Sequence, residues 1–263
     1  DETGTEALRR YYASYARLAD DLGAGLVLDT VTWRASADWG EKLGYDAAAL
    51  ANVNRRAVAL LRELHRDDPP IVVSGCVGPR GDGYAADATM TAAAAERYHE
   101  PQIAVLAEEG VDAISALTLT YASEAIGIVR VARRHGVPAV ISFTVETDGR
   151  LPSGEELGEA VEQVDREAGG GPAYFMVNCA HPTHFADVLE PPWLERIAGV
   201  RANASKRSHA ELDASDELDA GDPDELGERY RELAELLPRL AVVGGCCGTD
   251  ERHVAAVARA VTR

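Results

Sequence analysis

The sequence predicts an α/β fold, a (β/α)8 TIM barrel whose first strand is missing from this sequence. Short apolar runs alternate with longer amphipathic stretches along the chain. Strands that alternate with helices pair in parallel through right-handed crossovers, which is the rhythm of α/β folds. The length of 263 residues fits one large barrel, so we expect a single domain over residues 1–263.

Seven segments have the short apolar composition of buried strands. They are Leu26–Asp29, Ile71–Ser74, Ala113–Leu119, Ala139–Phe143, Tyr174–Asn178, Val200–Asn203 and Ala241–Gly244. A (β/α)8 barrel needs one more strand, and the chain opens directly on a helical pattern at Glu6–Leu22. We therefore expect the absent strand to be the first, with residues upstream of Asp1 removed or left out of this sequence.

The stretches between the strands have helical periodicity. After the opening helix, we predict helices at Ala47–Arg66, Ala92–Glu109, Ala122–His135, Gly154–Ala168, Pro223–Leu236 and His253–Val261. An open doubly wound sheet is the alternative, but it usually has a Gly-rich turn after its first strand, and none is visible. Two long segments, Thr32–Gly44 and Ala204–Asp222, follow strands and belong to the barrel rim that carries active sites.

The composition excludes several classes of function. With 26 basic and 44 acidic side chains, the formal charge is −18, which argues against a nucleic-acid partner. It is compatible with a cationic small molecule, although solubility is its commoner meaning. No secretory signal or long apolar run indicates export or a membrane span. Four cysteines do not form a disulfide framework, so we expect a cytoplasmic protein, and the oligomeric state stays open.

Three cysteines close two of the apolar runs. Cys179 ends one predicted strand, and the adjacent pair Cys246 and Cys247 follows another, with glycines on both sides of the pair. Three thiolates that meet at one mouth would hold a zinc ion and leave its fourth position open, as in catalytic sites. Neighbouring residues on a strand point to opposite faces, so the pair can share a metal only where the backbone turns, which glycines permit.

Other polar residues at the same strand ends form a candidate substrate-binding set. They are Asp29, Thr30, Thr32, Ser74, Gly75, Thr118, Thr144, Glu146, Asn178 and Asn203. Individual threonines and asparagines at such positions often only cap helices or loops. We interpret Cys76 as a buried packing residue and His181 as a capping or loop histidine, with ligand or metal binding as the alternative for His181.

Several motifs resemble the homocysteine S-methyltransferase family, in the same order along nearly the whole chain. They are Val-Ser-Gly-Cys-Val-Gly-Pro at 73–79, Ile-Ser-Phe-Thr at 141–144, Val-Asn-Cys at 177–179 and Gly-Gly-Cys-Cys-Gly-Thr-Asp at 244–250. The stretch Tyr12–Ala35 also matches the family's second strand unit. The resemblance implies a zinc-dependent barrel that methylates homocysteine to give methionine, with Zn²⁺ held by Cys179, Cys246 and Cys247.

The chemistry of such a site is coherent. A thiolate, not a thiol, is the reactive form, and binding to zinc deprotonates a thiol. The nucleophile would therefore be the substrate's own thiol, and no catalytic side chain is implied. Three cysteine thiolates leave the centre net negative, which suits a sulfonium or ammonium methyl donor, and the displacement requires alignment. The implied partners are thus a small-molecule thiol and a methyl donor.

The sequence departs from the family pattern in two places. The Asp-Gly-Gly element of the family's first strand has no counterpart, and Leu117–Thr120 lacks the glutamate that several members use for the substrate ammonium group. Glu124 and Glu146 are nearby alternatives, and the acceptor could be another thiol. The competing functions are a barrel lyase or hydrolase with phosphate at Gly244–Gly248, and a redox sensor that oxidises the adjacent cysteines.

Overall fold

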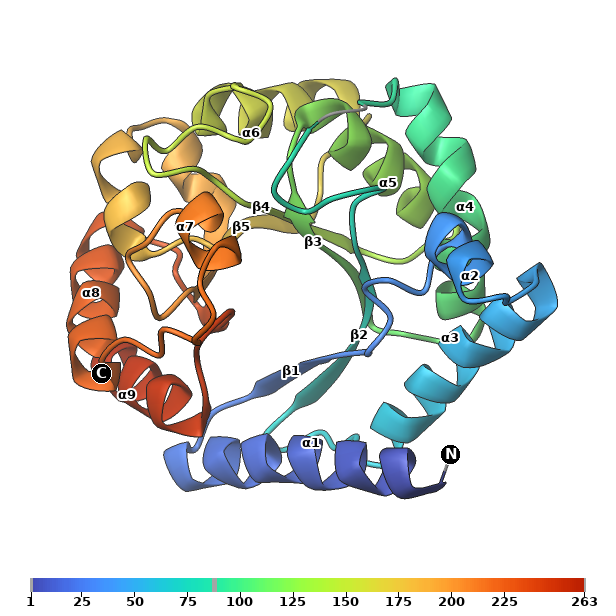
Figure 1. Ribbon diagram of the computed structural model, residues 1–263, viewed down its shortest axis with the longest axis horizontal. Helices are drawn as coiled ribbons and strands as arrows, with labels where there is room; N and C mark the ends of the chain where they lie inside the picture. The colour runs from blue at the N-terminus through green and yellow to red at the C-terminus, as the bar shows by residue number, and fades with distance from the viewer. Residues whose placement is uncertain (1, 87–88, 263) are drawn as a thin grey trace.

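The computed structural model describes residues 2–86 and 89–262. Seven parallel strands pair in chain order into one curved sheet. The strands are β1 (Leu26–Asp29), β2 (Ile71–Val77), β3 (Ala113–Leu119), β4 (Ala139–Phe143), β5 (Tyr174–Asn178), β6 (Ile197–Ala202) and β7 (Val242–Gly245). Figure 1 shows the sheet curling inside a ring of helices. The prediction of a parallel α/β fold is confirmed, as a seven-stranded half-barrel.

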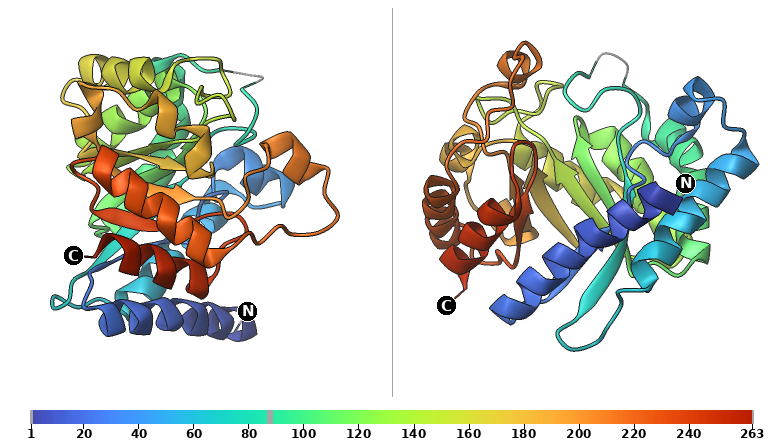
Figure 2. Two further views of the ribbon diagram at one scale, coloured as in Figure 1. Left: turned by 90° about the vertical axis from the view of Figure 1, so that its left-hand side faces the viewer. Right: turned by 60° about the horizontal axis from the view of Figure 1, so that its bottom comes forward.

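Helices cover the outer face of the sheet (Figures 1 and 2). They are α1 (Glu2–Leu22), α2 (Ala37–Lys42), α3 (Ala47–Arg62), α4 (Ala92–Glu108), α5 (Ala122–Arg134), α6 (Leu157–Glu167), α7 (His209–Asp213), α8 (Pro223–Leu236) and α9 (Glu251–Val261). Three short 3₁₀ turns between β5 and β6 are η1 (Pro182–His184), η2 (Ala186–Val188) and η3 (Trp193–Arg196). Within the described part of the chain, no helix is long and apolar enough to cross a membrane.

Side-chain caps fix where several of these helices begin. Asp46 accepts a hydrogen bond from the amide of Ala49 at the start of α3. Asp222 caps α8, which then opens with Pro223, a residue suited to a first helical position because it lacks an N–H. Asp250 begins α9 in a capping box. Such caps satisfy amides that have no partner inside the helix.

The two end strands of the sheet do not meet. In the residues that the structure describes, no pairing joins β7 to β1, so the eighth strand of a closed barrel is not seen. The helical layer nevertheless continues across this edge, because α1 contacts both β1 and α9 (Figure 1). The molecule therefore has a continuous outer layer around an open sheet.

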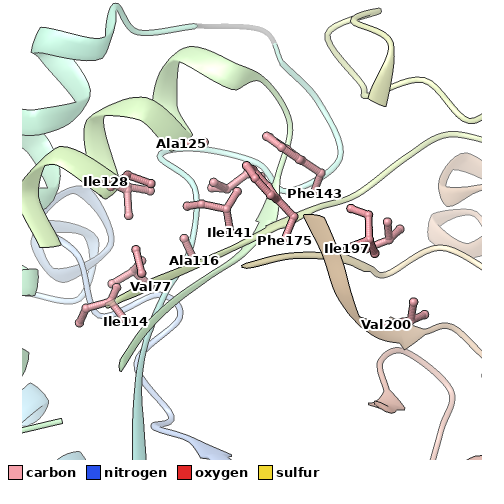
Figure 3. Packing of buried hydrophobic residues seen from close by; sticks show 14 of the residues in the cluster. Val77, Ile114, Ala116, Ala125, Ile128, Ile141, Phe143, Phe175, Ile197 and Val200 are labelled. Carbon is pink, nitrogen blue, oxygen red and sulfur yellow. The ribbon is translucent and has the colours of Figure 1, made fainter. Parts of the chain in front are cut away.

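Apolar side chains fill the space between the sheet and the helices (Figure 3). Phe143 of β4 and Phe175 of β5 stack with ring centroids 6.2 Å apart, and both are fully buried. Ile114 and Ile141 lie in the same cluster with Ile128 of α5. Each such burial stabilises the fold by roughly 1.5–3 kcal/mol. This core supports the middle of the sheet.

The inner face of the sheet is unusually polar. Ser74 of β2 and Ser115 of β3 share a hydrogen bond of 2.6 Å, and both are buried. Arg201 of β6 reaches across the interior to Asp29 of β1, with Nη1 2.6 Å from Oδ2. These contacts join strands that are far apart in sequence, so the interior is held by polar links as well as packing.

The bounds of several elements differ from the prediction. Strand β2 continues to Val77, and β6 begins earlier, at Ile197. The start of β6 contains Gly199, where a Cβ would lie 2.6 Å from Cγ of Met176. Glycine is uncommon inside strands, so this part of β6 could not be predicted from the sequence. Here glycine is needed because the side chain of Met176 occupies the space of a Cβ. The two long rim segments also contain short helices, α2 and α7, that were not predicted.

Candidate metal centre

Three cysteine sulfurs meet at the carboxyl-terminal end of the sheet. Cys179 follows β5, whereas Cys246 and Cys247 follow β7. Their sulfur atoms all lie within 4.8 Å of one another, and the Sγ atoms of Cys179 and Cys247 are 3.6 Å apart. Zinc–sulfur bonds of about 2.3 Å in a tetrahedron place two sulfurs about 3.8 Å apart. The donor set and its spacing therefore fit a metal ion.

Backbone turns aim these side chains at one point. Cys179 has a φ of 57°, a left-handed conformation that is costly for a residue with a Cβ. Gly248 follows the adjacent pair Cys246 and Cys247. It has a φ of 79°, and a Cβ there would lie 2.5 Å from the carbonyl oxygen of Asp219. Glycine is thus required after the pair both for its conformation and for the close approach of another segment.

Asn203 joins the two cysteine segments. Its Nδ2 donates to the carbonyl of Cys179 at 2.9 Å, and its Oδ1 accepts the amide of Cys247 at 3.1 Å. The next residue, Ala204, donates its amide to the carbonyl of Cys247 at 3.0 Å. Asn203 is almost fully buried, so these bonds are protected from water. This predicted site residue therefore sets the relative positions of two cysteines.

His209, the first residue of α7, also reaches the carbonyl of Cys179. Its Nε2 lies 2.6 Å from that oxygen, and its Nδ1 lies 3.1 Å from Oε1 of Glu146. The ring thus contacts two oxygen atoms, one through each of its nitrogens. Thr144 adds a longer bond of 3.5 Å from Oγ1 to the Cys179 carbonyl. Two predicted residues, Glu146 and Thr144, thus belong to the surroundings of Cys179.

Tyr84, from the segment between β2 and α4, covers the sulfur cluster. Its hydroxyl lies 3.3 Å from Sγ of Cys179 and 3.7 Å from Sγ of Cys247. Its ring packs on the ring of His209, with centroids 4.4 Å apart. Burial, together with the neighbouring cysteines, raises the pKa of Tyr84. The phenol therefore keeps its proton at neutral pH, with two sulfurs within hydrogen-bond distance of its oxygen.

The three thiols differ in acidity. Hydrogen bonds from Cys179 and Cys246, with a further one from Tyr84, lower the pKa of Cys247 far below its usual value. Hydrogen bonds with Cys246 and Cys247, together with burial, raise the pKa of Cys179. Cys247 is also the most exposed of the three cysteines.

A cavity of about 260 Å³ opens beside the cluster. Cys247 and Tyr84 line one side of it. The rim segment that carries α7 lines the other with Asp213, Asp216 and Glu217. A small molecule in this cavity would lie against Cys247, and the acidic side chains around the cavity favour a cation.

Four of the predicted rim residues lie deeper and are used internally. Thr32 donates to the carbonyl of Cys76 at 2.6 Å, while Thr30 accepts the Cys76 amide at 2.9 Å. Ser74 is bonded within the sheet as described above, and Gly75 faces α4, where a Cβ would lie 3.0 Å from Leu106. Cys76 is buried at 3% exposure, in agreement with a packing role.

Asn178, Thr118 and Asp29 complete the predicted set. Asn178 accepts the amide of Thr118 at 2.9 Å and donates to its Oγ1 at 2.8 Å. Thr118 has a φ of 65°, so these bonds from Asn178 of β5 hold a strained residue on β3, two strands away in the sheet. Asp29 is committed to Arg201. None of these three residues lines the cavity beside the cysteines.

The two acidic alternatives for binding an ammonium group have different surroundings. Glu124 is fully buried and bonded to Nε2 of His99 at 2.8 Å and to the amide of Arg80 at 2.7 Å. Glu146 has a side chain 36% exposed and stands beside the sulfur cluster through His209. Of the two, only Glu146 is accessible to a ligand.

Sequence reasoning missed Tyr84 and His209. Tyr84 lies in an irregular segment rich in glycine, which gave no sign of its position. His209 follows Ser208, which forms a capping box with Glu211. That motif could have revealed the helix and where it begins. His181 caps η1 by accepting the amide of Thr183, as the loop interpretation predicted.

Comparisons with known proteins agree with this geometry. The chain is 28% identical to a methionine synthase of Mycobacterium leprae over 97% of its own length and 21% of that protein. It is 29% identical to the methionine synthase of Mycobacterium tuberculosis over 82% of its length and 19% of that protein. The chain thus spans about a fifth of these two relatives. It is 28% identical to homocysteine S-methyltransferase 4 of Zea mays, over 86% of this chain and 69% of that protein.

Among solved structures, the metallated form of the homocysteine methyltransferase MmuM from Escherichia coli is similar, with a TM-score of 0.74. The match covers 97% of this chain and 84% of that one at 19% identity, a level that shows a shared fold. A family model described as homocysteine S-methyltransferase matches residues 3–261. The chain belongs to the homocysteine S-methyltransferase family.

Proposed function

We propose that this chain transfers a methyl group from a sulfonium or ammonium donor to a thiol, with homocysteine as the first candidate acceptor and methionine as its product. The observation that carries the proposal is the meeting of three cysteine sulfurs within 4.8 Å beside a cavity. We further propose Cys179, Cys246 and Cys247 as the ligands of a Zn²⁺ ion. The names of the relatives support homocysteine as the acceptor.

The residues around the cluster have separable tasks in this proposal. A bound zinc ion would make a substrate thiol a thiolate at neutral pH. Asn203 fixes two of the cysteines, and the Tyr84 hydroxyl donates toward their sulfurs. The substrate sulfur then forms a bond to the methyl carbon as the bond from that carbon to the donor atom breaks, and the donor leaves neutral. Acidic side chains around the cavity would attract the cationic donor.

The open edge of the sheet, between β7 and β1, also calls for an explanation. Val242 and Val243 of β7 are only half-buried, unlike the residues of the middle strands. We propose that residues 1–263 form one domain of the (β/α)8 type, whose open edge between β7 and β1 is completed by an eighth strand. The chemistry requires free thiols, and the four cysteines are unpaired. A reducing compartment such as the cytoplasm suits that requirement.

The test is a measurement of bound zinc together with a methyl-transfer screen over sulfonium and quaternary ammonium donors. We expect Cys246→Ser and Cys247→Ser to lose both zinc and methyl transfer while the fold survives, because a serine hydroxyl is a much weaker zinc ligand than a thiolate. Cys76→Ser is the matched control and should keep zinc, because Cys76 is buried in the sheet interior.

Circular dichroism would show whether each variant is folded. Full zinc content and full activity in Cys247→Ser would remove the metal role and with it this proposal. Parallel assays with homocysteine and other small thiols would identify the acceptor. A preference for a different thiol would correct the acceptor and keep the reaction.

A further inference from the structure

The carbonyl of Cys179 accepts an unusual number of hydrogen bonds. His209 lies 2.6 Å away through Nε2, Asn203 2.9 Å through Nδ2, and Thr144 3.5 Å through Oγ1. These donors come from three separate segments of the rim. They converge on a residue whose left-handed φ of 57° is disfavoured for any side chain with a Cβ. External contacts must therefore hold Cys179 in this conformation.

His209 makes the shortest of these contacts with the Cys179 carbonyl, and two other residues hold its ring in place. Glu146 faces its Nδ1 at 3.1 Å, and the Tyr84 ring packs against it at 4.4 Å between centroids. The histidine is only 9% exposed although it begins a five-residue helix in a long rim segment. The hydroxyl of Tyr84 in turn meets two of the sulfurs. One imidazole thus contacts the backbone of one cysteine and the residue that covers the cluster.

We propose that His209, held by Glu146, is a positioning residue for the metal centre. Its Nε2 bond fixes the carbonyl of Cys179, so that the sulfur of this left-handed residue points at Cys246 and Cys247. Its ring seats Tyr84 against the same sulfurs. The inference rests on the proposed function in that the three cysteines are taken as metal ligands. His209 lies outside the strand ends that carry the family motifs, so those motifs do not indicate its role.

The two ring nitrogens allow a matched pair of substitutions. The amide nitrogen of glutamine reaches the position of Nε2, whereas the amide nitrogen of asparagine reaches that of Nδ1. His209→Gln therefore keeps a donor for the Cys179 carbonyl and loses the hydrogen bond to Glu146. His209→Asn keeps a donor for Glu146 and gives up the carbonyl. The two variants are similar in polarity and remove the same aromatic ring.

The readout is metal affinity, measured by competition between the purified protein and a chelator for Zn²⁺. Substituted Co²⁺ adds a spectroscopic signature, because thiolate-to-cobalt charge transfer reports on the sulfur ligands. Loss of a residue that orients a ligand typically weakens metal binding on the order of 10- to 100-fold. We expect that loss, with a weaker charge-transfer band, in His209→Asn, and a clearly smaller loss in His209→Gln.

His184→Asn is the control for a rim histidine. His184 bonds the carbonyl of Lys206 at 2.8 Å through Nε2 and touches none of the cysteines. It should bind zinc as the unaltered protein does, and thermal unfolding would show that all three variants are folded. Unchanged affinity in both His209 variants, or an equal loss in both, overturns the inference.

The outcome is distinguishable from failure of the proposed function. If the unaltered protein binds the metal through sulfur but transfers no methyl group to any thiol, the proposed reaction fails and the positioning role stands. If the unaltered protein binds no metal, the ligand assignment and the positioning role both fail. Methyl transfer with equal metal affinities in all forms keeps the function and removes only the role of His209.

Discussion

The middle and the edge of the sheet are built differently. Every residue of β4 is buried, whereas every residue of β7 is only half-buried. Strand β4 has a partner on each side and a helical layer outside it, while β7 pairs only with β6 among the described residues. The cysteines come from both regions, one after β5 and two after β7. The geometry of the cluster therefore depends on how the edge is held against the middle.

Polar links, more than packing, hold that edge. Arg201 extends from β6 across β7 to the Asp29 carboxylate at 2.6 Å on β1, and its Nε also faces the carbonyl of Gly245 at 3.4 Å. The Tyr230 hydroxyl accepts the Ala202 amide at 2.9 Å and donates to the Gly244 carbonyl at 2.7 Å. Such bonds are directional, so they fix the position of β7 more closely than its partial burial would.

The largest expected difference between the two regions is in the cost of removing apolar volume. Phe143→Ala should lower the free energy of unfolding by about 3–5 kcal/mol, because it leaves a cavity in a closed core. Val242→Ala should cost about 1 kcal/mol, because solvent already reaches that side chain. Urea unfolding of both variants gives the comparison. A Val242 cost equal to that of Phe143 would show that the edge is as closed as the middle.

Next in size is the ion pair at the edge. Arg201→Met should reduce the free energy of unfolding by ~1–3 kcal/mol, because it strands a half-buried Asp29 carboxylate whose Oδ1 has no partner in the described structure. Adding Asp29→Asn to this variant should recover part of the loss, since the unpaired charge is then removed. Denaturation of the two single variants and the double variant gives the coupling. Strict additivity would mean that the pair does not hold the edge.

The smallest effect concerns an ion pair on the outer layer over the middle of the sheet. Although burial opposes it, hydrogen bonds from Arg134 and Arg130 lower the pKa of Glu96. A lowered carboxyl pKa gives stability that is present above the unfolded value of about 4.5 and is lost as the pH falls below it.

Glu96→Gln should therefore unfold more easily by about 0.5–1 kcal/mol at pH 7, and the difference should shrink below about pH 4.5 and vanish once the pH lies below the lowered pKa of Glu96. Thermal unfolding at both pH values measures it. Glu162→Gln on the exposed side of α6 is the control, because the described structure gives that carboxylate no ion pair. A difference that persists at low pH would mean that packing, not charge, explains the effect.

The contrast between the two regions also decides how much of the fold could be predicted. The bounds of β3, β4 and β5 were predicted correctly, because these strands are continuous apolar runs with clear ends. The prediction for β6 began three residues late, at Val200, and that for β7 began one residue early, at Ala241. Gly199 leaves room for the side chain of Met176, and Arg201 pairs with Asp29. The contacts that explain these two residues in a strand therefore come from other parts of the chain.

The site follows the same division. The cysteines end apolar strands, and their position could be predicted from the rhythm of strands and helices. The contacts that Tyr84 and His209 make around the cluster could not be predicted, because the paths of the segments that carry these residues depend on long-range contacts. Asn203 was predicted as a rim residue, but its bonds to both cysteine segments required the three-dimensional structure. Local sequence patterns predict where strands end, but they do not predict the contacts that the loops make.

The close approach at Gly248 has a consequence for redesign of the cavity beside the cysteines. Gly248 meets the backbone of Asp219, and Gly221, with a φ of 54°, meets the carbonyl of Ala204 at 2.3 Å from a Cβ position. The cysteine turn and the acidic segment are thus locked together at their bases. A library that seeks new donor preferences should randomise Asp213–Leu218, which lies between these contacts, and keep both glycines invariant.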